Sequence, residues 1–277
     1  MPQLIIGTAQ WGLDYGITNS QGQLSDQVIR GLVERSMDVG IVNLDTAASY
    51  GSAETRIADL VPRDFSIQTK VSGKNAHHLV ERLSESLTRL AREKVHCLLI
   101  HDWFALSIQD KEITAQQLLK VQQEGRVRDI GISAYTFEDL SESLNLLPKN
   151  ITVQIPLNPL DQRFIGTDFD FPDIKFQARS LFLQGLLIEP TGQFSAHPDL
   201  LRFQQFAQSL NMSPLEAALT FAAQQSWLDS MVIAPTTVME LDQIIQYLNP
   251  ERMSRQDIDF RNCVSEDLHL VDPRTWN

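Results

Sequence analysis

The feature of this sequence that most restricts its fold is an eightfold alternation of short apolar runs and longer segments with helical periodicity. Each apolar run is followed by a polar turn and then by a segment in which apolar residues recur every three or four positions. Most of them read as continuous apolar runs, such as LLI before His101 and IVNL before Asp45, which is typical of parallel strands buried on both faces. The predicted strands lie at residues 4–7, 41–44, 65–70, 95–100, 129–133, 152–156, 175–180 and 231–234.

The segments between these strands favour one closed α/β architecture. Predicted helices lie at residues 24–40, 52–60, 76–91, 114–125, 136–147 and 238–248, with a weaker segment at 169–173. The region 197–225 has room for two helices, and Ser213 to Glu216 reads as a capping box for the second of them, while Gly40 stands in a C-cap position. Eight strands that alternate with helices close naturally into a (β/α)8 TIM barrel. No linker rich in Pro, Gly or Ser divides the chain, so residues 1–277 are predicted to form a single domain with a C-terminal helical tail from about residue 250.

Composition excludes several classes of protein. The chain has 23 Lys and Arg against 35 Asp and Glu, a net charge of −12 without clustered basic residues, so nucleic-acid binding is not expected. No run approaches the about 20 apolar residues of a membrane span, and no leader peptide is recognisable, so we expect a cytoplasmic protein. Cys97 and Cys263 have neither disulfide nor zinc spacing and are expected to be plain thiols, and no metal site is predicted.

Four ionisable residues stand at or just after the ends of three successive predicted strands. Asp45 and Tyr50 follow the second strand, Lys70 ends the third and His101 follows the fourth. Because active sites of such barrels assemble at the carboxyl ends of strands, the four side chains are predicted to share one mouth. Each alone has an ordinary interpretation, as a helix cap, a packing residue, a solvated charge or a core histidine. Together they are much less expected by chance and indicate a catalytic site.

The residues around these positions resemble the aldo-keto reductase family. GIVNLDTAASYGSAE resembles the segment that contains the family's Asp and Tyr. TK at the end of the third strand resembles the segment that contains its Lys, and LLIHDW resembles the segment that contains its His. GIS, QIPLNPLDQR and ARSLFLQGLL resemble its cofactor-side strands, and the resemblance runs from Leu4 to about Leu248. It implies an enzyme that reduces an aldehyde or ketone with a hydride from a nicotinamide cofactor, NADP or NAD.

The resemblance also implies roles for the four residues. Tyr50 would donate the proton to the carbonyl oxygen, which develops negative charge as the hydride arrives. Lys70 beside it would favour the phenolate that remains. Asp45 would pair with Lys70, and His101 would hydrogen-bond the carbonyl and orient it.

For the cofactor, the resemblance carries over to a set of residues near several strand ends. Ser133 and Gln154 would hold the nicotinamide carboxamide, although Ala134 replaces an Asn that is common in the family. Arg179 stands where the family often has an aromatic residue, so it would either stack on the nicotinamide ring or form a structural salt bridge. The full predicted set is Thr8, Ser133, Gln154, Arg179, Ser180, Leu181, Gly185, Thr236, Thr237 and Glu240.

The segment after the eighth strand bears on the choice between NADPH and NADH. Residues 232–251 contain no Lys or Arg that could hold a 2′-phosphate, and they contain Glu240 and Asp242. A carboxylate near the ribose suits a free hydroxyl and repels a phosphate. We therefore expect NADH to bind at least comparably to NADPH, which the family favours, unless Arg252 or Arg255 folds back.

The substrate and the rival functions are less constrained. Trp11 and Trp103 are candidates to line a mouth for a small-molecule carbonyl substrate, with packing at the barrel rim as the alternative. Short loops suggest an open mouth, and the YGITN segment suggests a sugar or polyol carbonyl. A Schiff-base lyase or aldolase with Lys70 as nucleophile, and a catalytically silent cofactor-sensing barrel, are the alternative functions. The sequence carries no signal of oligomeric state.

Overall fold

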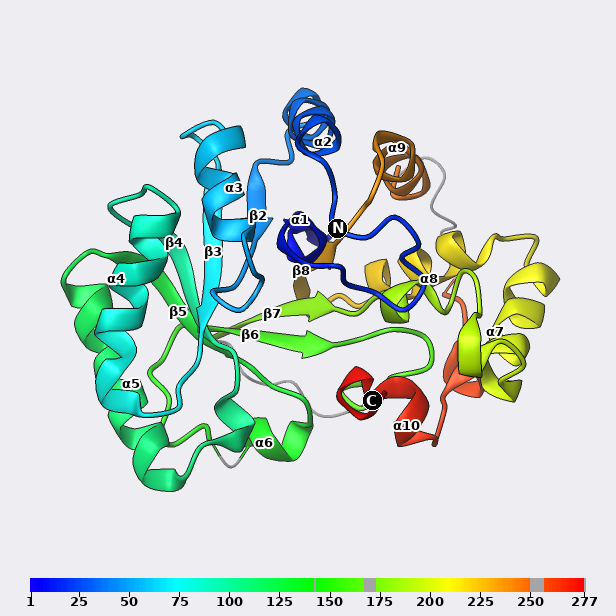
Figure 1. Cartoon of the computed structure of the whole chain (residues 1–277). Coiled ribbons are helices and arrows are strands. Elements are labelled where there is room, and N and C mark those ends of the chain that lie inside the picture. Colours follow the sequence, from blue (N-terminus) through cyan, green and yellow to red (C-terminus); the bar gives the residue numbers. More distant parts are fainter. Residues whose placement is uncertain (142, 167–172, 250–256, 277) are drawn as a thin grey trace.

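The fold is a closed barrel of eight parallel strands in chain order, which confirms the predicted (β/α)8 architecture (Figure 1). The computed structural model describes residues 1–141, 143–166, 173–249 and 257–276. β1 pairs with both β2 and β8, so the barrel has no free edge. The strands are β1 Gln3–Gly7, β2 Asn43–Asp45, β3 Ser66–Val71, β4 Val95–Ile100, β5 Val127–Ser133, β6 Ile151–Pro156, β7 Ile174–Arg179 and β8 Leu228–Ile233.

The helices α2 to α9 lie around the strands, while the short α1 and α10 lie at the carboxyl end of the barrel (Figure 1). The helices are α1 Ala9–Gly12, α2 Asp26–Asp38, α3 Ala53–Leu60, α4 Leu79–Arg89, α5 Ile108–Gln123, α6 Phe137–Ser141, α7 Pro198–Ser209, α8 Pro214–Ala223, α9 Val238–Tyr247 and α10 Leu268–Val271. Short 3-10 turns are η1 Ala76–His78, η2 Trp103–Ala105, η3 Leu183–Gly185, η4 Gly192–Phe194, η5 Arg261–Cys263 and η6 Pro273–Thr275. Among the described residues, no helix combines the length and apolar character that a membrane span requires.

Several helix boundaries differ from the sequence prediction, most clearly those of α5 and α6. α5 begins at Ile108, earlier than the predicted residue 114, because Ser107 caps it by accepting a hydrogen bond from the Asp110 backbone amide. α6 ends at Ser141, well before the predicted residue 147. The weak helical segment predicted at 169–173 lies outside the described residues except for Asp173.

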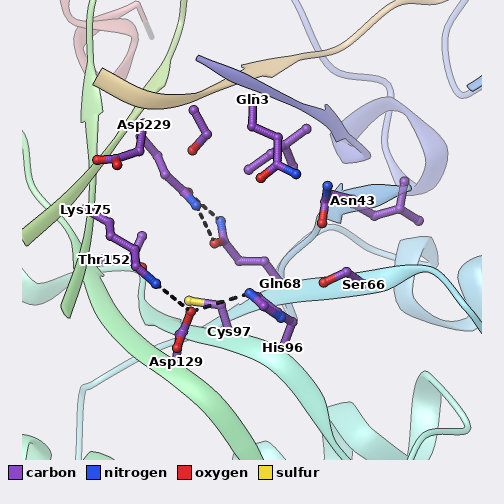
Figure 2. Close-up of a pocket in the computed structure, with 14 residues that line it drawn as sticks. Gln3, Asn43, Ser66, Gln68, His96, Cys97, Asp129, Thr152, Lys175 and Asp229 are labelled. Carbon is purple, nitrogen blue, oxygen red and sulfur yellow. Dashed lines mark hydrogen bonds and ion pairs between the residues drawn. The ribbon is translucent and has the colours of Figure 1, made fainter. Parts of the chain in front are cut away.

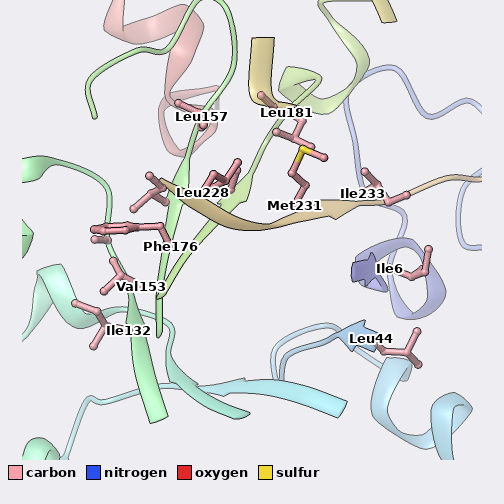
Figure 3. Packing of buried hydrophobic residues seen from close by; sticks show 14 of the residues in the cluster. Ile6, Leu44, Ile132, Val153, Leu157, Phe176, Leu181, Leu228, Met231 and Ile233 are labelled. Carbon is pink, nitrogen blue, oxygen red and sulfur yellow. The ribbon is translucent and has the colours of Figure 1, made fainter. Parts of the chain in front are cut away.

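The hydrophobic core lies between the strands and the surrounding helices (Figure 3). Successive strand residues point to opposite faces. In β3, Thr69 faces outward and its hydroxyl donates to Glu54 of α3. Gln68 and Lys70 therefore point into the barrel, where both are almost fully buried. Apolar strand residues thus anchor the helices, while the interior of the barrel carries polar side chains that need partners.

The C-terminal segment packs against the carboxyl end of the barrel. Residues 250–256, where the predicted tail begins, lie outside the described residues. From 257 onward the chain forms η5, α10 and η6. The Ser265 amide donates to the Leu160 carbonyl, and the guanidinium of Arg274 lies 3.5 Å from the ring centroid of Tyr135, just after β5. The tail therefore lies beside the barrel mouth.

Candidate functional site

A cavity of about 540 Å³ opens at the carboxyl ends of the strands. Asp45, Tyr50, Lys70 and His101 all line it. The structure thus brings the four predicted catalytic side chains into one mouth, as expected from their positions at adjacent strand ends.

A buried ion pair lies at the base of this cavity. Lys70 Nζ donates to Asp45 Oδ2 at 2.5 Å and to the Thr46 carbonyl at 3.2 Å. The two charged residues are 2% and 3% exposed. Burial by itself lowers the pKa of Lys70, but Asp45 and then Tyr50 raise it more strongly, so the net pKa is raised. Lys70 is therefore a permanent ammonium group at neutral pH.

Tyr50 lies above this ion pair on a tight loop. Lys70 Nζ is 5.1 Å from the centroid of the Tyr50 ring. The loop packs on α1 so closely that a Cβ atom at Gly12 would lie 1.8 Å from the Tyr50 carbonyl oxygen. Gly51, with φ of 55°, follows in the left-handed region. Glycine at position 12 is thus required to place the tyrosine over the lysine.

His101 completes the group beside Tyr50. The two ring centroids are 6.1 Å apart and the ring planes are nearly perpendicular, at 87°. Burial, followed by the charges of Lys70 and Arg179, lowers the pKa of His101 to about 4. His101 Nδ1 lies 3.3 Å from Ser49 Oγ. When Ser49 donates to Nδ1, the neutral ring carries its hydrogen on Nε2, as a donor for a substrate oxygen needs. Ser49 was missed from the sequence, because a serine in a loop gives no specific signal.

Three glutamines inside the barrel form a further layer beneath the ion pair. Gln68 Nε2 donates to Asp45 Oδ1 at 2.6 Å and to Gln177 Oε1 at 2.9 Å, and Gln177 Nε2 donates back to Gln68 Oε1 at 3.0 Å. Gln154 Nε2 donates to Asp45 Oδ1 at 3.0 Å. Every one of these bonds joins different strands, so the layer fixes the carboxylate of Asp45. Sequence reasoning did not identify Gln68 or Gln177.

A second cavity lies at the opposite end of the barrel, and Gln68 and Gln177 also line it (Figure 2). This cavity has a volume of about 280 Å³. Asp129 in its wall pairs with His96 at 3.4 Å and with Lys175 at 3.2 Å. Burial raises the pKa of the Cys97 thiol in the same wall to about 12, so it is a structural thiol. Among the described residues, no group of three His, Cys, Asp or Glu side chains could hold a metal ion.

The residues predicted to hold a cofactor gather around the mouth cavity. Ser133, at the end of β5, lines it, and its hydroxyl has no hydrogen-bond partner among the described residues. A buried hydroxyl that is open to a cavity suits a polar ligand. Thr237 is the exception, because it caps α9 and its Oγ1 accepts from the Glu240 amide. The predicted residues that line the cavity are Thr8, Ser133, Gln154, Arg179, Ser180, Leu181, Gly185, Thr236 and Glu240.

The two acidic residues of α9 have different environments. Glu240 lines the cavity, and its carboxylate accepts from the Thr236 amide at 2.7 Å and from the Thr236 hydroxyl at 3.0 Å. Asp242 forms an ion pair with Arg35 of α2 at 2.6 Å and does not line the cavity. Of these two residues, only Glu240 therefore presents negative charge to the cavity. Arg252 and Arg255 lie outside the described residues.

Arg179 is the second departure from the family pattern. Its guanidinium carbon lies 4.2 Å from the centroid of the Tyr135 ring, and Nη1 lies 3.4 Å from Ser180 Oγ. Within the described residues, Arg179 has no carboxylate partner, so the structural salt bridge weighed from the sequence is not found there.

The two tryptophans considered for substrate binding lie in the core instead. Trp11 is 1% exposed and Trp103 is fully buried, with its indole nitrogen donating to Ser143 Oγ at 2.7 Å. Neither lines the cavity. Their placement supports the packing alternative and corrects the expected substrate contact, because both side chains are buried in the hydrophobic core. Besides Tyr50, the aromatic residues Tyr15, Tyr135 and Phe182 line the mouth cavity.

Comparisons with known proteins agree with this geometry. A family model described as "Aldo/keto reductase family" matches residues 3–260. An aldo-keto reductase of Mycolicibacterium paratuberculosis is 30% identical over 178 residues, which cover 60% of this chain and 61% of the relative. A methylglyoxal reductase of Escherichia coli O157:H7 is 33% identical over 147 residues, 50% of this chain and 55% of the relative. The matches thus span only about three fifths of these curated relatives.

Solved structures share the fold at lower identity. The holo form of an aldo-keto reductase from Bacillus halodurans has a TM-score of 0.72 at 17% identity, with 91% of this chain and 89% of that chain covered. A thermostable aldo-keto reductase solved with the inhibitor epalrestat has a TM-score of 0.69 at 20% identity, with 91% and 93% covered. The barrel is therefore of the same kind.

Proposed function

The chain belongs to the aldo/keto reductase family, and from that premise we propose that it reduces an aldehyde or ketone with a hydride from a nicotinamide cofactor. The observation that carries the proposal is the buried Lys70–Asp45 pair beneath Tyr50, in a cavity that also holds a neutral His101. A proton donor, a fixed cation and a neutral hydrogen-bond donor are the groups that carbonyl reduction requires of the protein.

Each side chain has a distinct part in the proposed reaction. The Tyr50 hydroxyl donates its proton to the carbonyl oxygen, and the ammonium group of Lys70 stabilises the phenolate that remains. Asp45 holds Lys70 in place through Oδ2, while Oδ1 is held by Gln68. His101 Nε2 donates to the carbonyl oxygen and orients it. The cofactor supplies the hydride when bound.

The cavity also supports a cofactor assignment. Ser133 and Gln154 would bind the carboxamide, since both line the cavity and Ser133 Oγ and Gln154 Oε1 have no partner among the described residues. Glu240 at the far end favours the free ribose hydroxyls of NADH over the 2′-phosphate of NADPH. We infer that NADH binds at least as tightly as NADPH.

The chemistry of Lys70 argues against a Schiff-base lyase. A nucleophilic lysine needs a free amine at working pH, which proteins obtain by lowering its pKa. Here the pKa of Lys70 is raised, because Asp45 and Tyr50 outweigh the effect of burial. The amine is also bonded to Asp45 and the Thr46 carbonyl. The reductase is therefore the better supported function.

The substrate proposed is a small, hydroxylated carbonyl compound such as a sugar or polyol carbonyl. Several polar residues line the cavity, among them Gln10, Thr18, Asn19 and Gln21. The name of the Escherichia coli O157:H7 relative, a methylglyoxal reductase, also points to a small carbonyl compound.

A direct assay tests the proposed function. Purified protein with reduced cofactor and an activated aldehyde, such as nitrobenzaldehyde, should show loss of absorbance at the reduced-nicotinamide band. Folded protein that binds neither NADH nor NADPH in fluorescence titrations contradicts the proposal. Cofactor binding without turnover on any aldehyde supports the silent cofactor-sensing alternative instead.

A further inference from the structure

Arg179 carries a positive charge in the mouth cavity that no carboxylate neutralises within the described part of the chain. The other cation of the cavity, Lys70, is paired with Asp45. Arg179 Nη2 is buried and has no hydrogen-bond partner among the described residues. A buried charged donor without an acceptor is destabilising, so an acceptor supplied by a ligand would bind favourably.

The surroundings of Arg179 hold its side chain but leave its charge free. Its guanidinium stacks on Tyr135, whose ring also contacts Arg274 at 3.5 Å. Arg274 Nε donates to Asp272 Oδ1 at 2.8 Å, so that second guanidinium is neutralised. Two cations therefore lie against one ring, and only Arg179 both lines the cavity and lacks a counter-ion.

The charge of Arg179 also acts on the catalytic residues. It contributes, after burial and Lys70, to the lowered pKa of His101. Neither Glu240 nor Glu189 of the cavity neutralises Arg179. The Glu240 carboxylate accepts hydrogen bonds from Thr236, and the exposed Glu189 forms no ion pair with Arg179. The cation thus faces a space shared with the carbonyl-binding groups.

We propose that the carbonyl substrate carries a carboxylate, which Arg179 binds while Tyr50 and His101 hold the carbonyl oxygen. This inference rests on the proposed reductase function, and it specifies in addition that the substrate is negatively charged. A guanidinium matches the planar geometry of a carboxylate and binds it through charge-assisted hydrogen bonds. A phosphate, with close to two negative charges, fits less well because Glu189 and Glu240 line the same cavity.

The test compares an acid with its neutral ester. The probes are para-carboxybenzaldehyde and methyl para-formylbenzoate, and the measured quantity is the ratio of their kcat/KM values in each protein. Arg179→Met should lower the acid-to-ester ratio by about tenfold or more, the loss expected of one charge-assisted hydrogen bond. Arg179→Lys, which keeps the charge, should retain part of the preference. An unchanged ratio in Arg179→Met overturns the proposal.

Two controls separate the competing explanations. The double variant Asp272→Asn/Arg274→Met removes the neutral ion pair at the same ring and should keep the wild-type ratio. Dissociation constants for the reduced cofactor should be similar in wild type and Arg179→Met. If Arg179→Met weakens cofactor binding and slows both aldehydes equally, Arg179 contacts the cofactor and the proposal is wrong.

A binding measurement keeps the inference separate from the reductase function. Calorimetry with para-(hydroxymethyl)benzoate, the product of the acid probe, reports the carboxylate site without turnover. Binding that Arg179→Met abolishes supports the site even if no aldehyde is reduced, in which case the reductase proposal alone fails. Binding that is equally strong in Arg179→Met, or absent from wild type, contradicts the carboxylate site.

Discussion

Gln68 Nε2 lies 2.6 Å from Asp45 Oδ1, the carboxylate oxygen that Lys70 does not bind. Asp45 is thus held from two directions, by Lys70 at the mouth and by the glutamine layer inside the barrel. Gln68 does not line the mouth cavity. It acts on the site only by positioning Asp45, and through it Lys70 and Tyr50.

Replacing Gln68 by Met should therefore impair turnover more than cofactor binding. The carboxylate would keep Lys70 and Gln154 but lose a short hydrogen bond, and we expect kcat to fall by about tenfold. The pH dependence of kcat should also shift, because the field around Tyr50 depends on where Asp45 and Lys70 lie. Gln3→Met, at the opposite cavity, serves as the control. A loss of stability with an unchanged kcat pH profile would show a merely structural role.

Removal of the Tyr50 hydroxyl tests the proton donor. Tyr50→Phe should lower kcat by about 10²- to 10⁴-fold, the usual contribution of a positioned acid. Affinity for the cofactor should change little, because the hydroxyl matters mainly in the transition state. Steady-state kinetics and fluorescence titration measure the two quantities. Turnover near the wild-type rate, with chemistry shown to be rate-limiting, would assign the proton to another group.

Replacement of Lys70 should affect both stability and activity. Lys70→Met leaves Asp45 as a buried charge without its cation, and the free energy of unfolding should fall by about 3–5 kcal/mol. The double variant Asp45→Asn/Lys70→Met removes both charges and should recover part of that loss while remaining inactive. Urea unfolding measures the stability of all three proteins. Equal stability of wild type and Lys70→Met would contradict the buried pair.

His101 should make stability depend on pH below neutrality. Burial, then Lys70 and Arg179, lowers its pKa from 6.5 to about 4 in the folded protein. Between these values the unfolded chain binds a proton that the folded protein does not. The contribution of neutral His101 to the free energy of unfolding is therefore fully present above pH 6.5. It is lost as the pH falls towards 4, and the loss is at most about 3 kcal/mol.

The comparison of wild type with His101→Asn isolates this effect. The difference between their unfolding free energies should be larger at pH 7 than at pH 4.5, in favour of wild type. A difference that does not vary between these pH values would mean that His101 titrates normally in the folded protein.

Glu240 should control the choice of cofactor. Glu240→Gln removes negative charge from the cavity while keeping an acceptor for Thr236, so NADPH should gain about tenfold or less relative to NADH. Paired dissociation constants at low and moderate salt measure the change. The double variant Arg35→Met/Asp242→Asn removes an ion pair outside the cavity and should leave the ratio unaltered. Wild-type protein that binds NADPH more than tenfold tighter would point to Arg252 or Arg255 at the phosphate.

The strands could be predicted well from the sequence, because a buried parallel strand is a continuous apolar run. The predicted 95–100 agrees with β4 at both ends. The sharp ends of helices could also be predicted: Gly40 has φ of 75° after α2, and Ser213 caps α8 by accepting from the Glu216 amide. These features depend on local chemistry, which the sequence contains.

Contacts between side chains of different strands inside the barrel could not be predicted from the sequence. Gln68 lies in the mixed polar and apolar segment FSIQTK, and only closure of the barrel brings Gln177 and Asp45 to it. Trp11 and Trp103 follow strands near the catalytic residues, yet a large aromatic side chain there packs equally well in the core or at the mouth. The sequence shows which residues end a strand but not which way their side chains turn.

The measurement that tests the central claim most directly follows the hydride itself. The protein would be incubated with an aldehyde and with NADH that carries deuterium at the hydride-donating position, and the alcohol would be analysed by mass spectrometry. The account predicts one deuterium on the carbinol carbon in wild type and almost no alcohol with Tyr50→Phe. Alcohol without deuterium, or an adduct that borohydride traps on Lys70, would contradict it.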